Sequence, residues 1–163
     1  SVQSSANRHR IMPHIHDLID FTADCFIVYD NKVLLIFHKK HKIWLQIGGH
    51  IELNEDPEEA LLREIKEECG LDVEIIGTKE PNIEVEGTKF LYPPTFMNIH
   101  KVSDTHKHIG LFYIAKAKSD KFIHNREEHD DIRWFSREDL DNPDFKLSGS
   151  LKFYAKEALL RAQ

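Results

Sequence analysis

Three glutamates stand at helical spacing shortly after a pair of glycines. On a helical wheel, Glu64, Glu67 and Glu68 fall within one arc of roughly 100°. Neighbouring carboxylates on a helix repel one another, and a bound divalent cation reverses that repulsion. Clustered oxygen donors suit Mg²⁺, with Mn²⁺ as a second candidate, better than they suit zinc. The spacing therefore predicts a divalent-metal site that could clamp a diphosphate and activate a water molecule.

The residues around these glutamates form a longer pattern, which argues against an ordinary solvated acidic face. Gly49 is followed after five residues by Glu55, and after seven more by the run Arg63-Glu-Ile-Lys-Glu-Glu-Cys-Gly-Leu71. This pattern resembles the Nudix box, and every defining position of the box is filled. The resemblance spans about residues 20–140, although Ile47 stands where many family members have proline. It implies an α/β fold, a Nudix-type α/β/α sandwich with a central mixed β-sheet.

The resemblance also implies roles for individual residues. Glu64, Glu67 and Glu68 would bind the divalent ions, and the backbone carbonyl of Gly49 would join them. Gly suits that position because it lets the backbone approach an ion closely. We count Glu64 and Glu67 among the expected catalytic residues.

Arg63 is the only cation among the box positions that the family defines. The resemblance implies that Arg63 orients the carboxylates by pairing with Glu55, and its bidentate fork suits that task better than a lysine would. We therefore place Arg63 with the catalytic residues and Glu55 with the structural ones. The two residues lie far enough apart that the loop between them must fold back.

The general base has more than one candidate. Some family members use the box glutamate that matches Glu64, and others use a glutamate on a distant loop. Here the distal candidates are Glu127 and Glu128, in a stretch that leads to Trp134. Glu128 fits the family spacing better, so we expect Glu128 to be catalytic.

Histidine is unusually frequent, with 11 residues in the chain. None shows the paired Cys and His spacing of a structural zinc site, so partly exposed polar histidines are the default interpretation. His50 follows the glycine pair and His108 precedes an apolar run, so we expect both to reach substrate. Trp44 has a place typical of core residues, yet it is also a candidate for stacking on a nucleobase.

The helix that carries the glutamates has the clearest local signals. Asp56 is a suitable N-cap, Pro57 stands at the first helical position, and Glu59 completes a capping box. Gly70 stands where a helix C-terminus favours a left-handed residue, so we assign it a structural role. The pattern predicts a helix over Asp56–Cys69.

The other elements follow from hydrophobic periodicity and turn residues. We expect short helices over residues 11–20 and Ser136–Leu140, a closing helix over Leu151–Leu160, and loops over Thr78–Thr95. The expected strands are Phe21–Tyr29, Lys32–Phe37, Trp44–Ile47, Leu71–Gly77, Phe96–Val102, Ile109–Ala117 and Ile132–Phe135. Residues 1–20 would form a tail and short helix, residues 21–145 the Nudix hydrolase domain, and residues 146–163 a helix packed on that domain.

Composition limits the class of protein. The chain has 163 residues, 40% hydrophobic and 31% charged, which is ordinary for one globular domain. Its formal net charge of −6 disfavours a broad electrostatic contact with a nucleic-acid duplex. No apolar run is long enough for a membrane span, and two cysteines without CxxC spacing favour a reducing, cytoplasmic setting.

The function that these observations predict is a Mg²⁺-dependent hydrolase that cleaves a diphosphate linkage in a nucleoside diphosphate joined to another moiety. The main alternative is a catalytically silent Nudix-fold domain that binds a nucleotide or acts in regulation. A Nudix-fold isomerase acting on a prenyl diphosphate is disfavoured, because no cysteine nucleophile stands in a comparable setting. The expected partner is a small-molecule nucleotide or another diphosphate substrate, whose identity the sequence leaves open. The oligomeric state is also open, and a homodimer is one possibility.

Overall fold

A computed structural model describes residues 16–163 of the chain. Within these residues, eight strands form one mixed sheet, with helices on both of its faces. The strands are β1 (Ile19–Tyr29), β2 (Lys32–His38), β3 (Trp44–Leu45), β4 (Ile47–His50), β5 (Val73–Ile75), β6 (Phe96–Lys101), β7 (Lys107–Ala117) and β8 (His129–Phe135). The helices are α2 (Pro57–Cys69), α3 (Arg137–Asp141), the 3₁₀ helix η1 (Pro143–Phe145) and α4 (Gly149–Arg161).

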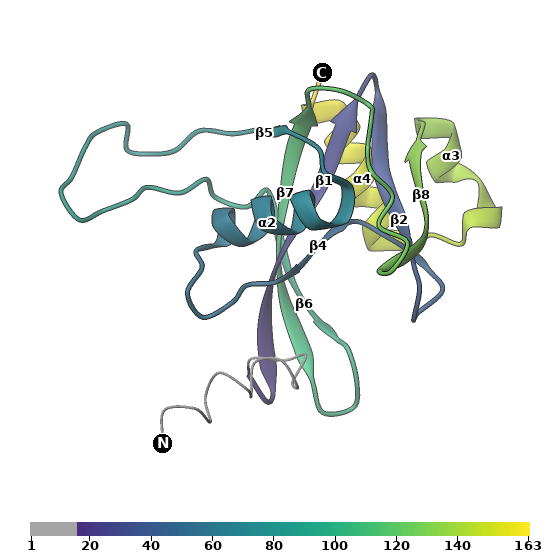
Figure 1. Cartoon of the computed structure of the whole chain (residues 1–163), viewed down its shortest axis with the longest axis horizontal. Coiled ribbons are helices and arrows are strands. Elements are labelled where there is room, and N and C mark those ends of the chain that lie inside the picture. The colour runs from purple at the N-terminus through teal and green to yellow at the C-terminus, as the bar shows by residue number, and fades with distance from the viewer. Residues whose placement is uncertain (1–15) are drawn as a thin grey trace.

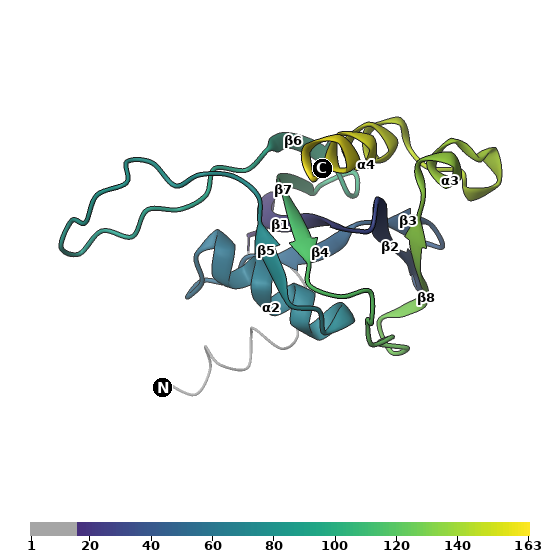
Figure 2. The ribbon, with the colours of Figure 1, turned by 90° about the horizontal axis from the view of Figure 1, so that it is seen from above.

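The long strands β1 and β7 form the centre of the sheet and run parallel to each other. The main strand order is β3-β2-β1-β7-β5, and every other pairing is antiparallel. The short strand β4 pairs with the first half of β1, β6 pairs with β7, and β8 pairs with β2. Figure 1 shows α2 lying across these strands, and Figure 2 shows the sheet between α2 on one side and α4 on the other. The α/β/α sandwich is therefore confirmed.

Alternation along β1 divides the apolar core into two parts, because successive side chains of a strand point to opposite faces. Cys25 and Ile27 belong to the cluster that includes Ile65 of α2. Phe26 belongs to the second cluster, which includes Ala155 of α4. Each helix thus covers one face of the sheet with the apolar side of its wheel.

Helix α2 begins and ends at the predicted residues. The Asp56 carboxylate accepts a hydrogen bond from Glu59 N at 2.9 Å, and the Glu59 carboxylate accepts one from Asp56 N at 3.4 Å. Pro57 is the first helical residue, and Gly70 adopts the left-handed conformation with φ 68°. These contacts confirm the predicted capping box and C-terminal glycine.

Two of the predicted elements are wrong in detail. Ile19 and Asp20 lie in β1 rather than in a helix, because their backbone pairs with β7 in register with Lys107 and His108. The rest of the predicted helix, up to residue 15, lies outside the described residues. The predicted strand Trp44–Ile47 is split at Gln46, because the chain changes partner there from β2 to β1.

The turn between β1 and β2 falls in the gap between two predicted strands, and the predicted loop over Thr78–Thr95 is present. Asp30 and Asn31 both have positive φ, 45° and 58°, as a two-residue turn between β1 and β2 requires. The segment between β5 and β6 extends away from the sheet (Figure 1) and contains one isolated bridge, Val85 to Thr88. Among the helices of residues 16–163, none is long and apolar enough to cross a membrane.

Candidate functional site

The guanidinium of Arg63 is the centre of the hydrogen-bond network around α2. Its Nε donates to Glu55 Oε2 at 2.7 Å and its Nη2 to Glu55 Oε1 at 2.9 Å, which is the predicted bidentate pair. Nη2 also donates to the backbone carbonyl of His50 at 3.0 Å. Nη1 donates to Glu64 Oε1 at 2.9 Å and to Glu67 Oε2 at 3.3 Å. One side chain therefore joins the loop before the helix to two of the predicted metal-binding carboxylates.

Gly48 and Gly49, in the middle of β4, contact two of the carboxylates. Gly48 N donates to Glu68 Oε2 at 3.1 Å. A Cβ atom added at Gly49 would lie only 2.3 Å from Glu64 Oε1, so no larger residue fits there without displacing that carboxylate. The structure thus brings Gly49, Glu64 and Glu68 together, as the sequence predicts.

The carboxylates carry a strong electrostatic penalty in this arrangement. Burial, together with the nearby Glu64 charge, raises the pKa of Glu68 to about 9, although the hydrogen bond from Gly48 N opposes the shift. Burial likewise raises the pKa of Glu64 to about 7, although Arg63 opposes the shift. Both shifts mean that the ionised forms lack enough compensating positive charge. The clustered donors are all oxygens, so the residues fit a hard divalent cation such as Mg²⁺.

The loop before β8 is anchored on the C-terminal end of α2. Its residues donate hydrogen bonds to the carbonyl groups of the last three residues of α2. Carbonyl groups at the end of a helix have no partners within the helix. The bonds are Ile123 N to Cys69 O at 2.8 Å, Asn125 Nδ2 to Glu67 O at 3.2 Å, and His129 Nε2 to Glu68 O at 3.1 Å. No pattern in the sequence predicted this contact.

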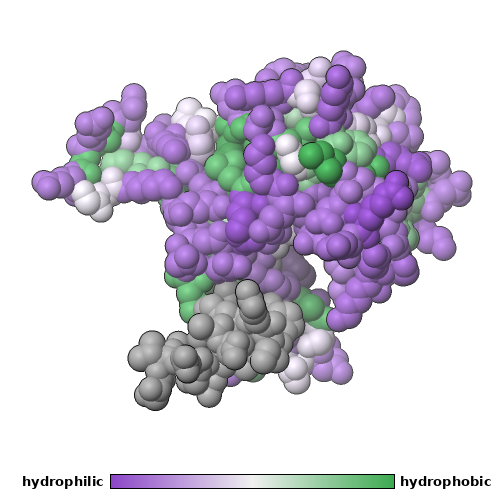
Figure 3. Space-filling view, in the orientation of Figure 1, coloured by the Kyte–Doolittle hydropathy of each residue, from purple (hydrophilic) through white to green (hydrophobic). Residues whose placement is uncertain are grey.

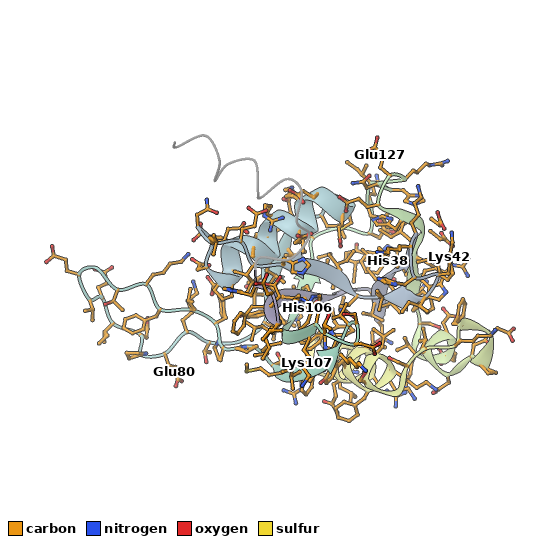
Figure 4. All side chains as sticks on the ribbon, turned by 90° about the horizontal axis from the view of Figure 1, so that it is seen from below. His38, Lys42, Glu80, His106, Lys107 and Glu127 are labelled. Carbon is orange, nitrogen blue, oxygen red and sulfur yellow. The ribbon has the colours of Figure 1, made fainter. Side chains whose placement is uncertain are left out.

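The anchored loop carries the two distal glutamates. Glu128 lies close enough to the predicted metal-binding carboxylates that its charge raises the pKa values of Glu64 and Glu68. The pKa of Glu128 is itself raised, first by burial and then by Glu67. Glu127 projects outward from the body of the protein (Figure 4). Of the two candidates for a distal base, the structure therefore brings Glu128 to the carboxylate cluster.

Trp44 does not reach this cluster. Its ring packs edge-on against Phe135 and Phe145, with centroids 4.9 and 5.9 Å apart, in the core region next to α4. This is the core position that the sequence indicated for Trp44, and its alternative role of stacking on a nucleobase stays a prediction. The aromatic partners offered by β8 and η1 hold the ring.

The side chains of His50 and His108 also lie apart from the glutamates. His50 stands opposite Thr22 and His108 opposite Asp20 in the sheet. These positions of β1 share the face of Phe26, which packs against Tyr154 of α4. The two rings therefore occupy the face opposite α2, and only the backbone carbonyl of His50 joins the Arg63 network.

Asp24 is a buried acid that the sequence analysis did not select. Its carboxylate accepts hydrogen bonds from Thr22 Oγ1 at 2.6 Å and Gln46 Nε2 at 3.0 Å. Burial raises its pKa to about 6. The sequence signal for Asp24 was an acidic residue within the mostly apolar predicted strand Phe21–Tyr29, and it stands opposite Gly48 in the sheet.

Figure 3 shows that the outer surface over α2 is mainly hydrophilic.

Comparison with known proteins identifies the family. A family model described as the NUDIX domain matches residues 20–156. The crystal structure of a NUDIX-family hydrolase from Clostridium perfringens is 38% identical, covers 88% of this chain and 98% of its own, and superposes with a TM-score of 0.80. The chain therefore belongs to the Nudix hydrolase family, as the motif predicted. The matched region extends beyond the predicted limit near residue 140 and includes part of α4.

Two further similarities are more limited. A MutT NUDIX hydrolase from Burkholderia pseudomallei shares the fold with a TM-score of 0.61 at 22% identity, and covers 89% of this chain and 98% of its own. The NAD-capped RNA hydrolase NudC from Vibrio atlanticus is 44% identical over 54 residues. That match covers 30% of this chain and only 20% of the NudC protein.

Proposed function

We propose that the protein is a hydrolase that uses Mg²⁺ or Mn²⁺ to cleave a diphosphate linkage in a nucleoside diphosphate joined to another moiety. The observation that carries the proposal is the meeting of Glu64 and Glu68 at Gly48 and Gly49 of β4, with Arg63 bonded to Glu64, Glu67 and Glu55. Family membership supports the same reaction class. Carboxylates held this closely are unfavourable unless a cation compensates them.

Each of these residues has a part in the proposed reaction. Glu64, Glu67, Glu68 and the Gly49 carbonyl would hold the divalent ions. When bound, such ions supply positive charge that compensates the phosphate oxygens and lowers the pKa of a water molecule. Arg63 keeps two of the carboxylates oriented, and Glu55 keeps Arg63 oriented through the bidentate pair.

Glu128 is the proposed general base. A general base must lie within hydrogen-bond reach of the proton that it takes from the attacking water, directly or through one further water. The anchoring of its loop to the last carbonyl groups of α2 holds Glu128 beside the metal-binding carboxylates. The proton from the attacking water would pass to the Glu128 carboxylate as the diphosphate bond breaks. Glu64 is the alternative base that the family resemblance left open.

One relative indicates a class of substrate. The Vibrio atlanticus relative is named for the hydrolysis of NAD-capped RNA, which places dinucleotides with a diphosphate bridge among the compounds to test.

The cellular setting that we propose is the cytoplasm. Both cysteines are free and buried, which is consistent with a reducing, cytoplasmic setting.

A substrate screen tests the proposal. Nucleoside triphosphates, nucleotide sugars, dinucleotides and diphosphate lipids are incubated with wild-type protein and either Mg²⁺ or Mn²⁺, and phosphate-bearing products are measured. The Glu67→Gln variant should lose most of the activity on any compound cleaved. Glu157→Gln is the matched control, because Glu157 also pairs with an arginine four residues away on a helix, Arg161 of α4. Full activity in Glu67→Gln, or no cleavage of any diphosphate, contradicts the proposal. Binding without turnover would instead favour the catalytically silent domain.

A further inference from the structure

A second group of metal-ligating side chains lies on the face of the sheet opposite α2. Asp20 of β1 and His108 of β7 are neighbours in the parallel register. His50, the last residue of β4, stands opposite Thr22 on the other side of β1. His106 comes just before β7, and Figure 4 shows it among the strands beside Lys107. Four side chains from three strands and one turn therefore converge at one end of the sheet.

These side chains lie close enough together for small movements to bring them onto one metal ion. Asp20, His106 and His108 each present a donor atom, and these three atoms lie within 4.8 Å of one another. His50 Nε2 lies 3.2 Å from His108 Nε2 and 3.4 Å from Asp20 Oδ2. In a tetrahedral zinc site with bonds near 2.0–2.1 Å, neighbouring ligand atoms are about 3.3–3.4 Å apart. The separations of His50 from His108 and from Asp20 are close to that value, whereas the atoms of Asp20, His106 and His108 are held only within 4.8 Å and would draw together around an ion.

A contact outside the cluster orients His106 in a way that suits coordination. His106 Nδ1 lies 3.1 Å from the backbone carbonyl of Asp17. A bond to a carbonyl requires a proton on Nδ1, so a neutral His106 carries its lone pair on Nε2. Histidines that bind metals usually donate their second ring nitrogen to a carbonyl or carboxylate in this manner.

Burial and donor type distinguish this cluster from the glutamate site. Asp20 is 1% exposed and His106 is 5% exposed, so the carboxylate and one ring are shielded from water. The His50 side chain is 29% exposed, which gives an ion a way in from solvent. Imidazole nitrogens suit zinc, copper or nickel, whereas Mg²⁺ prefers oxygen donors. The chemistry therefore differs from that of Glu64, Glu67 and Glu68.

We propose that Asp20, His50, His106 and His108 bind a zinc-class transition-metal ion at a site separate from the glutamate site. The ion joins the first residues of β1 and β7 to the end of β4. The backbone of His50 also accepts a hydrogen bond from Arg63, so the ion holds in place the residue that follows Gly49. This inference goes beyond the proposed hydrolysis, because it concerns another face of the sheet and other ligands.

Metal analysis of the purified protein, freed of any affinity tag, tests the site without reference to hydrolysis. Zn²⁺ is added, excess is dialysed away, and the bound metal per chain is measured by mass spectrometry. Co²⁺ is then substituted, because four-coordinate Co²⁺ has characteristic visible absorption. We expect one tightly held Zn²⁺ per wild-type chain and that absorption with Co²⁺. Wild-type protein that holds no Zn²⁺ under these conditions overturns the proposal, since the cluster is then a hydrogen-bonded network alone.

Variants assign the ligands. His108→Ala and the nearly isosteric Asp20→Asn should each weaken Zn²⁺ binding by more than the roughly 10- to 100-fold that loss of an outer-shell partner costs. His41→Ala is the matched control, because His41 stacks on His38 at 4.6 Å in a different part of the protein. Glu67→Gln should keep the Zn²⁺, which separates this site from the proposed Mg²⁺ site. Circular dichroism verifies folding. Folded His108→Ala and Asp20→Asn proteins that bind Zn²⁺ like wild type contradict the assignment, as does loss of Zn²⁺ in His41→Ala.

Discussion

Replacing Gly49 with alanine adds one methyl group where the backbone approaches the Glu64 carboxylate. The added carbon would lie 2.3 Å from Glu64 Oε1, whereas ordinary van der Waals contact begins at 3.4 Å. The carboxylate must therefore move by about 1 Å, and a displacement of that size costs about 100-fold in rate at a positioned site. Glu64 has little freedom to move because Arg63 Nη1 binds it at 2.9 Å.

The substitution should affect the site far more than the fold. Gly49 is not in the left-handed region, so alanine adds no backbone strain there. The overpacking itself costs about 1–3 kcal/mol. We expect Gly49→Ala to bind Mn²⁺ roughly tenfold or more weakly, by analogy with the loss of a supporting residue. Electron paramagnetic resonance titration measures this affinity without any substrate, and the turnover of a compound found in the screen measures the rate.

Gly149→Ala is the matched control. Gly149 begins α4, and a Cβ added there meets nothing within 4 Å. That variant should bind Mn²⁺ like wild type and be about 0.4–1 kcal/mol more stable. If folded Gly49→Ala retains both wild-type Mn²⁺ affinity and wild-type turnover, then the close approach of Gly49 to Glu64 does not constrain the metal site, and the reasoning is refuted.

Three other substitutions test separate parts of the site. Arg63→Lys loses the bidentate bonds to Glu55. Because the Arg63 side chain is 26% exposed, we expect the free energy of unfolding, measured by urea denaturation, to fall by only about 1–3 kcal/mol. An unchanged midpoint contradicts this expectation. Glu128→Gln should lower kcat by roughly 10²–10⁴ while Mn²⁺ affinity stays near wild type, whereas an equal fall in both would make Glu128 a metal ligand. Burial raises the pKa of Asp24 from 3.8 to about 6. The folded protein therefore holds this proton more tightly than the unfolded chain does, and the contribution of Asp24 to wild-type stability should fall as pH rises from about 4 to about 6. Asp24→Asn removes that loss, and its advantage over wild type should grow across this interval by up to about 3 kcal/mol; a difference independent of pH, measured by chemical denaturation, contradicts the account.

Local signals explain what the sequence predicted well. Helix α2 was predicted to within a residue because Asp56, Pro57 and Gly70 each act on the backbone next to them. The bidentate pair of Arg63 and Glu55 followed from the family pattern and is present in the structure. Where the determinant of a feature lay within a few residues, the prediction was confirmed.

Features that depend on residues far apart in the chain were not predictable in the same way. The contact between Ile123 and Cys69 joins a loop to a helix end, and neither residue carries a pattern that marks it. The clustering of His50 with His108 depends on the register of β4 and β7 against β1. The helix predicted up to residue 20 failed for the same reason, because the parallel pairing of Ile19 with β7 outweighs local helical spacing.

The loop that covers the C-terminal end of α2 has a consequence for dynamics. The amide of Ile123 is bonded to the carbonyl of Cys69, while Asn125 and His129 hold the two carbonyls before it. Loop and helix end therefore open together, and they form one cooperative unit in hydrogen exchange. When this unit opens, the backbone that carries Glu128 moves away from the carboxylate cluster. The exchange rate of a single backbone amide, that of Ile123, thus reports how often the proposed base is withdrawn from its place.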